Sequence, residues 1–330
     1  MRNHRVSLRD IAALSGVTKM TVSRYLREPS SVSLGTREKI ARVLEDIHYV
    51  PSRSANMMLN AKSSAIGILI PSFQNQVFAD ILAGMESVTG QYGFQLLISE
   101  YNYSSVSEEK QILNLMSYDV EGLVLCEKSH TSRARGFLTA ANIPIVEIMD
   151  TLEPQIDIEI GFNNRVAAYE MVTTMIGRGK RVIYYFSSRD DQRDNQRYAG
   201  YQQAMAKHGL DVYRLTPNKI SSFSLGALML QQALKEKVPP DGIFCTNDDI
   251  AVGVLFECLR NNISVPDTIS IAGFHGLDIG KAVTPMLASV NTPRFAIGKL
   301  SAEMLINKIN SRPVTRTIDV GFDIFQGETI

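Results

Sequence analysis

The chain has 330 residues, and its 34 Lys and Arg balance 34 Asp and Glu, so its formal net charge is zero. Hydrophobic residues make up 45% of the chain and charged residues 21%, which excludes a disordered, coiled-coil or collagen-like protein. No apolar run is long enough to span a membrane, and the N-terminus lacks the apolar core of a secretory signal. Three separated cysteines, Cys126, Cys245 and Cys258, indicate reduced thiols in a cytoplasmic protein.

Neutrality is an average over two unlike parts of the chain. Residues 1–62 contain 11 Lys and Arg against five Asp and Glu, which gives +6 and leaves −6 for the rest. A basic segment of this kind indicates nucleic-acid binding, although a solvated helical face has the same composition. The length predicts two or three domains.

Three short helices are predicted in the first 50 residues. Ser7 is a suitable N-cap for the first helix, which ends at Gly16 because glycine tolerates the positive φ of a tight turn. Thr18 caps the second helix, Pro29 ends it, and Ser33 caps the third. The apolar residues at helical spacing are predicted to form the core between the three helices. They are Leu8, Ile11, Ala12, Leu14, Val22, Tyr25, Leu26, Ile40, Val43, Leu44 and Ile47.

The first two helices have the pattern of a helix-turn-helix, in which a small residue and a glycine let two helices cross closely. The second helix of that motif enters the major groove of DNA with its N-terminal turn. Arg24 is expected to pair with a guanine or a phosphate, Lys19 to contact a base or a phosphate, and Met20 is equally a thymine contact or an exposed residue. The predicted DNA contacts of this segment are Leu8, Ser15, Thr18, Lys19, Met20, Thr21, Ser23, Arg24 and Arg27.

Strands and helices alternate in the rest of the chain. Short apolar runs separated by helical stretches are typical of a parallel sheet covered on both faces. About ten such strands exceed one compact domain, so we predict two doubly wound lobes with a ligand between them, at the carboxyl ends of the strands. The apolar runs lie at 65–70, 94–99, 122–126, 143–149, 181–186, 241–246 and 268–274.

The predicted boundaries follow from this alternation. Residues 1–50 form the helix-turn-helix headpiece, 51–62 a linker, and 63–330 the two-lobed ligand-binding domain. The first lobe takes about 63–161 and 293–325, and the second about 162–292. The late run TIDVGFDIF at 317–325 adds one strand to this domain.

Two motifs in the headpiece identify a family. TVSR at Thr21–Arg24, followed by VS and TREK within Val32–Lys39, resembles the N-terminus of the LacI family of bacterial transcription regulators. The similarity continues through the rest of the chain. The similarity is strongest toward regulators of gluconate and idonate catabolism, in the stretches VTKMTVSRYLR, NQVFADILAGMESVTG and CTNDDIAVG. The resemblance implies a two-lobed domain like that of periplasmic sugar-binding proteins.

The resemblance also assigns roles to the linker. In the family this segment forms a hinge helix on DNA and inserts an apolar side chain into the minor groove, which kinks the duplex. The family's leucine falls here on Met58, with Leu59 next to it, so either residue is the predicted wedge. The alternative for the segment is a plain linker.

Matched residue by residue, the resemblance places effector contacts in the loops after the strands. Arg197 would grip the effector, Asn247 and Asp248 would hydrogen-bond it, and Phe223 would stack on it. Asp150 would lie at the lobe junction. The predicted effector contacts are Ser72, Asn75, Phe78, Asp150, Arg197, Phe223, Asn247, Asp248 and His275.

His275 stands where relatives commonly have aspartate, within the sequence GFHG. An imidazole in place of a carboxylate removes a negative charge and adds a hydrogen-bond donor. Together with Arg197, and with Lys128 or Arg193, this change favours an anionic ligand. We therefore predict a sugar acid such as gluconate or idonate. A hydrogen-bonded loop residue is the alternative for His275, and a neutral sugar is the alternative effector.

Enzymatic alternatives find little support in the sequence. No GxGxxG follows the first strand, GxxxxGK[ST] and G-x-S-x-G are missing, and the five histidines have no metal-binding spacing. Asp248 and Asp249 resemble an acid–base pair, but a helix N-cap at Asn247 or Asp248 accounts for them. We therefore predict no metal and no cofactor, and a regulator rather than a dehydrogenase, a kinase or a sugar-binding transport protein.

The expected partners follow from the resemblance. A homodimer would place two recognition helices on a near-palindromic double-stranded operator. The end of the chain, GFDIFQGETI, contains no heptads, which favours a dimer over a tetramer. The protein would act in the cytoplasm at the nucleoid, without a membrane partner, and the effector would either release or strengthen DNA binding.

Overall fold

The computed structural model describes residues 6–49, 63–151 and 155–330. It divides the chain into two compact units, Met1–Ser63 and Ser64–Ile330. Met58 and Leu59, the predicted minor-groove wedge, lie outside the described residues. Within the described ranges no helix has the length and apolar character needed to cross a membrane.

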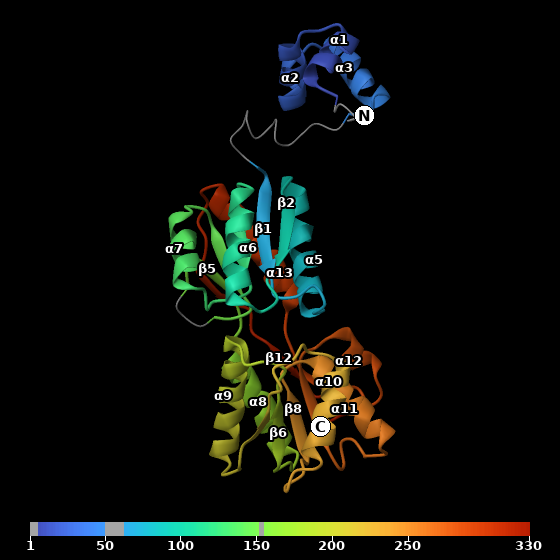
Figure 1. The fold of residues 1–330 in the computed structure, drawn as a ribbon, viewed down its shortest axis with the longest axis vertical. Helices are drawn as coiled ribbons and strands as arrows, with labels where there is room; N and C mark the ends of the chain where they lie inside the picture. The colour runs from blue at the N-terminus through green and yellow to red at the C-terminus, as the bar shows by residue number, and fades with distance from the viewer. Residues whose placement is uncertain (1–5, 50–62, 152–154) are drawn as a thin grey trace. The chain divides into compact units, whose positions relative to one another are not determined.

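Residues 6–49, the described part of the first unit, form three α-helices and one short 3₁₀ turn, in blue in Figure 1. Ser7 forms a capping box with Asp10 at the start of the first helix, and Gly16 ends that helix at a φ of 67°. The Thr18 hydroxyl accepts a hydrogen bond from the Thr21 amide and caps the second helix. The elements are α1 (Leu8–Ser15), α2 (Lys19–Arg27), η1 (Pro29–Ser31) and α3 (Leu34–Asp46).

The core of this unit differs from the prediction at one position. Ile11, Val22 and Ile40 are fully buried, as helical spacing predicts. Leu14, which we expected inside, is 61% exposed, and Ser15 is buried in its place. The inward stripe of α1 follows positions 8, 11, 12 and 15, and residue 14 falls outside that stripe.

The second unit contains two six-stranded sheets, each forming one lobe (Figure 1). The first sheet is parallel throughout, in the order β11-β5-β4-β3-β1-β2. Its strands are β1 (Ala65–Ile70), β2 (Gln95–Glu100), β3 (Gly122–Leu125), β4 (Ile145–Ile148), β5 (Ile158–Gly161) and β11 (Thr317–Asp319). Its helices are α5 (Val77–Thr89), α6 (Ser105–Ser117), α7 (Ser132–Ala140) and α13 (Arg294–Ile309), with η2 (Gly90–Tyr92) after α5.

The second sheet has the order β12-β10-β9-β8-β6-β7, and only β12 runs antiparallel to its neighbour. Its strands are β6 (Ile183–Phe186), β7 (Tyr213–Leu215), β8 (Gly242–Cys245), β9 (Ser270–His275), β10 (Ala288–Asn291) and β12 (Asp323–Phe325). Its helices are α8 (Asn164–Gly177), α9 (Gln192–Lys207), α10 (Phe223–Ala233), α11 (Asp248–Arg260) and α12 (Asp278–Ala282).

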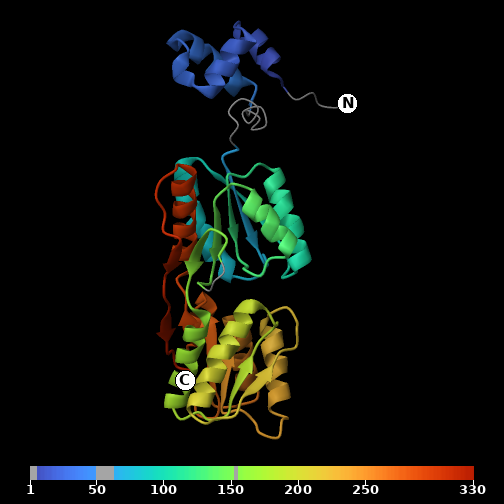
Figure 2. The same ribbon diagram turned by 90° about the vertical axis from the view of Figure 1, so that its left-hand side faces the viewer.

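The late run 317–325 forms two strands where we expected one. Gly321, at a φ of 67°, separates β11, which pairs with β5 in the first sheet, from β12, which pairs with β10 in the second. The range 293–325 therefore does not stay in the first lobe, because its last strand belongs to the second. The red end of the chain extends along both lobes in Figure 2.

The described chain crosses between the sheets after β5, after β10 and after β11. Three short crossings side by side form a hinge, which lets two rigid lobes change their relative angle. Each lobe is itself tightly packed. In the first, Gly84 of α5 and Gly298 of α13 let these helices approach so closely that a Cβ on Gly298 would lie 2.0 Å from the Ile81 carbonyl.

Candidate functional site

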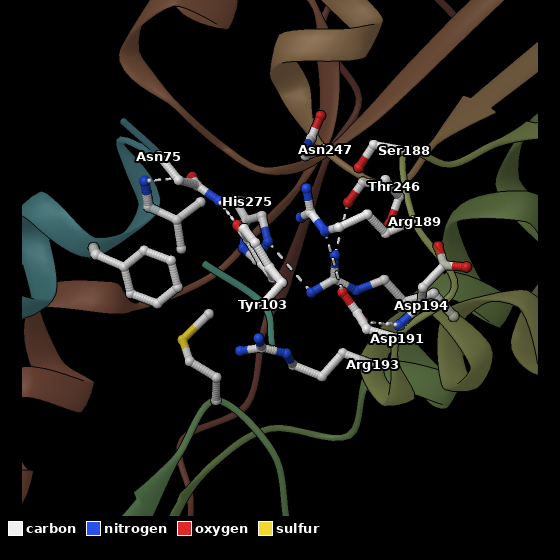
Figure 3. A pocket seen from close by; sticks show the side chains of 14 residues that line it. Asn75, Tyr103, Ser188, Arg189, Asp191, Arg193, Asp194, Thr246, Asn247 and His275 are labelled. Carbon is white, nitrogen blue, oxygen red and sulfur yellow. Dashed lines mark hydrogen bonds and ion pairs between the residues drawn. The ribbon is translucent and has the colours of Figure 1, made fainter. Parts of the chain in front are cut away.

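A polar cavity that opens to solvent lies between the two lobes, and the empty space at it, open solvent included, is about 460 Å³ (Figure 3). Its walls come from the carboxyl ends of strands in both sheets, which is where doubly wound folds bind ligands. The first lobe contributes Asn75, Val77, Phe78, Tyr103 and Met149. The second lobe contributes Ser188, Arg189, Asp191, Arg193, Asp194, Arg197, Thr246, Asn247 and His275.

Five of the nine predicted effector residues line this cavity, namely Asn75, Phe78, Arg197, Asn247 and His275. Asn247 is also the N-cap of α11, since its side-chain oxygen accepts a hydrogen bond from the Ile250 amide. The other four predicted residues do not line it. The Ser72 hydroxyl accepts a hydrogen bond from the Gln74 amide, and the buried Asp150 carboxylate accepts one from Gln196 at 2.6 Å.

Phe223 lies away from this cavity, so the predicted stacking on an effector there is not supported. It is the first residue of α10, is 42% exposed, and lines a separate groove with Leu228 and Phe256. Loop position after a strand does not specify which way a side chain points, and here the start of α10 directs the ring to the surface.

Asp248 is fully buried beneath the turn that carries His275. Its carboxylate accepts a hydrogen bond from the Ser289 hydroxyl at 2.7 Å and another from the Leu277 amide at 2.6 Å. The residue therefore fixes the turn after β9 instead of facing the cavity. The predicted direct hydrogen bond from Asp248 to the effector is not supported by this placement.

Burial raises the pKa of Asp248 to about 7, although its two hydrogen bonds favour the ionised form. The unfolded carboxyl has its usual pKa of 3.8. The contribution of Asp248 to the free energy of unfolding is therefore fully present below the pKa of the unfolded carboxyl. It is lost as the pH rises through the pKa of the folded carboxyl, and the total loss is roughly 4 kcal/mol.

We expect Asp248→Asn to remove most of this loss, because an amide does not ionise, and its oxygen can accept from the Leu277 amide while its NH₂ donates to the Ser289 hydroxyl. Urea unfolding of both proteins at pH values from about 4.5 to 7.5 measures the difference. Unfolding free energies that fall in parallel for the two proteins would contradict the assignment.

Three arginines at four-residue spacing dominate the charge of the cavity: Arg189, Arg193 and Arg197. Arg197 is held on several sides. Its guanidinium donates hydrogen bonds to the Asn164 side chain at 2.9 Å and to the Thr246 carbonyl at 2.7 Å. Burial lowers the pKa of Arg197 to about 10, so it keeps its charge at neutral pH.

The other two arginines keep hydrogen-bonding capacity. Arg189 lies over the Tyr103 ring, with 3.4 Å from the guanidinium carbon to the ring centroid, and its buried Nε has no hydrogen-bond partner in the described part of the chain. Arg193 points into the cavity (Figure 3), and no hydrogen bond or ion pair joins its guanidinium to another described residue. Sequence reasoning named Arg193 only as an option and missed Arg189. The four-residue spacing of arginines from the loop before α9 into its first turns is the signal that identifies both.

His275 lines the cavity, and its ring is hydrogen-bonded within the protein as in the alternative given for it. Burial, and then the charges of Arg197, Arg294 and Arg193, hold its pKa well below the usual value, so the ring is neutral. Its Nε2 faces the Arg197 guanidinium at 3.3 Å and must accept, so Nδ1 carries the proton and donates to Thr292 at 3.3 Å. Both ring nitrogens are thus engaged within the protein, and the expected extra donor for the ligand is not available.

Most predicted DNA contacts in the first unit are accessible. Thr18, Lys19, Arg24 and Arg27 are exposed, and Met20 is 72% exposed. Thr21, Ser23 and Leu8 are half-buried, with Leu8 packed against the helical core.

Ser15 differs from these residues. It is buried, and its hydroxyl donates a hydrogen bond to the Ile11 carbonyl at 2.6 Å, so this side chain does not present itself for DNA.

A three-helix unit with a helix-turn-helix, joined to a two-lobed α/β unit with a polar cavity between its lobes, defines an effector-responsive DNA-binding regulator. Among the described residues, no cluster of three or more His, Cys, Asp and Glu has a geometry that would hold a metal ion.

Comparisons with known proteins agree with that class. Residues 7–52 match the lacI family of bacterial regulatory proteins, and residues 172–327 match a periplasmic binding protein-like domain. The HTH-type transcriptional regulators IdnR and GntR of Escherichia coli K12 are 53% and 45% identical to the chain, each over the full length of both proteins. A lacI-family regulator from Silicibacter pomeroyi has a solved structure that superposes with a TM-score of 0.93 at 29% identity, covering 98% of this chain and 99% of its own.

The chain belongs to the lacI family of bacterial regulatory proteins. It is a DNA-binding transcriptional regulator with an effector-binding domain, and it is not an enzyme.

Proposed function

We propose that this regulator controls genes of sugar-acid catabolism, with its operator affinity set by a gluconate- or idonate-type acid bound between the lobes. The observation that carries the proposal is the Arg193 guanidinium, which points into a cavity that also contains Arg189 and Arg197 and forms no hydrogen bond with another described residue. A guanidinium fork matches a carboxylate with two parallel hydrogen bonds, which a neutral sugar cannot reproduce.

The charges of the cavity also favour an anionic effector over a neutral sugar. Two carboxylates, Asp191 and Asp194, face the three arginines. Asp194 is already bonded to Arg214 at 2.7 Å and to the Tyr185 hydroxyl at 2.6 Å, so it contributes little to neutralising the cavity. The cavity therefore keeps a positive excess that an anionic effector would balance.

The regulator would act as a homodimer on a near-palindromic operator, through the predicted DNA contacts of α2 and the linker. Exposed apolar side chains support association between copies. Phe223, Leu228 and Phe256 line one groove between α10 and α11 and are 42%, 56% and 44% exposed. A solvent-facing groove of this kind marks an interaction surface.

The effector would act through the hinge. It changes DNA affinity only by its different affinity for the two lobe arrangements. Because Asn75 and Phe78 come from one lobe and the arginines from the other, a bound acid contacts both and favours the arrangement in which they are close.

Calorimetric titration of the full-length protein tests the proposal. The ligands are gluconate and idonate, compared with glucose and with glucitol, a six-carbon polyol like gluconate but without a carboxylate. We expect each acid to bind at least about tenfold more tightly than either neutral compound, which is the effect of one lost charge-assisted contact. Tighter binding of glucose or glucitol than of both acids would make the neutral-sugar alternative correct.

A further inference from the structure

A second cavity adjoins the first at the opening between the lobes. It encloses about 960 Å³ including open solvent, and it shares Tyr103 and Asp191 with the arginine cavity. Tyr101, Glu108 and Glu127 line it from the first lobe, and Asp190 and Asn195 from the second. The shared residues place the two cavities side by side, so one elongated molecule can occupy both.

Two buried polar atoms beside this cavity have no partner in the described part of the chain. Tyr101 is 2% exposed and its hydroxyl forms no hydrogen bond. Glu108 is 1% exposed, and one of its carboxylate oxygens is likewise without a partner, while the other lies 2.9 Å from Nδ1 of His130. Buried polar groups are nearly always paired, so two orphans at one cavity point to a ligand that supplies the missing bonds.

The carboxylates around the second cavity do not make it a cation site, because each has its own positive partner. Asp190 lies 3.3 Å from the Arg214 guanidinium and Asp191 lies 3.7 Å from that of Arg189. Arg193 is the strongest opposite charge acting on Glu127.

His130 balances Glu108 in the same way. Burial alone would lower the pKa of His130, but its hydrogen bond to Glu108 and the Glu147 carboxylate 3.5 Å from Nε2 raise it to about 9, so it is charged at neutral pH. With its charges matched, the cavity offers hydrogen-bond acceptors and a phenol to neutral hydroxyl groups.

We propose that the second cavity binds the polyol end of the sugar acid, with its carboxylate on Arg193 and its far hydroxyls near Tyr101 and Glu108. This inference rests on the proposed function, and it adds a specificity that the arginines cannot provide. Arginine recognises any small carboxylate, whereas an acid must be long enough to reach the second cavity to gain the additional hydrogen bonds.

The test is a calorimetric series of aldonic acids of increasing length: glycerate, erythronate, ribonate and gluconate. We expect affinity to rise along the series in the natural protein. Tyr101→Phe removes only the hydroxyl, and should lower gluconate affinity about threefold to tenfold while changing glycerate affinity less than about twofold. The variant should unfold at no lower temperature, because the hydroxyl has no partner to lose.

Tyr118→Phe is the matched control, since Tyr118 is 59% exposed in the same lobe and lies outside both cavities. Its affinities should equal those of the natural protein. Gluconate binding that is unchanged in Tyr101→Phe, or equal affinity for glycerate and gluconate, would overturn the second cavity but leave the sugar-acid proposal standing. Failure of every acid to bind the natural protein would overturn both.

Discussion

Replacing Arg24 by alanine is expected to lower operator affinity about thirtyfold or more, because a bidentate arginine–guanine contact contributes about 1–3 kcal/mol and a dimer loses it in both half-sites. Arg24 is exposed on α2, whose N-terminal turn is capped by Thr18 and is therefore preformed for the major groove. Fluorescence anisotropy with labelled operator DNA at fixed salt measures the loss, and calorimetry with the effector should show no change.

Arg42→Ala is the matched control for this variant. Arg42 is exposed on α3, outside the recognition helix, so its removal takes away the same charge without a base contact. We expect a small loss that is equal for operator and random DNA. An equal loss for both DNAs in Arg24→Ala would instead assign Arg24 to a phosphate, and loss of effector binding in that variant would contradict the separation into two modules.

Helical and strand periodicity predicted the architecture because burial alone sets it. The run 65–70 is β1 in full, and all six of its residues are buried. The two errors have different causes. Leu14 is apolar but lies outside the inward stripe of α1, so helical spacing itself places it at the surface. The run 317–325 is divided by Gly321 between two sheets, which is a tertiary pairing that periodicity does not describe.

The effector site was harder to predict, since a loop position after a strand places a residue near the cavity without giving its direction. Asn247 and Asp248 are neighbours, yet the first lines the cavity and the second is buried beneath a turn. His275 is in the cavity, but its tautomer depends on Arg197 and Thr292, which are far away in the sequence. Such tertiary hydrogen bonds leave no local pattern in the chain.

Arg193→Gln is expected to weaken gluconate binding about tenfold to a hundredfold, because hydrogen bonds to a charged partner contribute about 1.5–3 kcal/mol. The guanidinium forms no hydrogen bond with other described residues, and its charge acts on Glu127 and Asp191, so its loss should remove a charge but no hydrogen bond from the fold. The operator affinity of the variant without effector should equal that of the natural protein. The gluconate concentration needed to change that affinity should rise by the same factor as the dissociation constant for gluconate. Calorimetry and anisotropy on the same samples measure both effects.

Two further variants make this result specific. Arg193→Lys keeps the charge but lacks the planar fork, so its affinity should lie between those of the natural protein and the glutamine variant. Arg312→Gln removes an exposed arginine outside the cavity and should bind gluconate normally. If gluconate bound equally well to Arg193→Gln and Arg312→Gln, the carboxylate would have to sit on Arg189 or Arg197. With the carboxylate on another arginine, the polyol chain of the acid would start from a different point, and Arg193 would not direct it toward the second cavity.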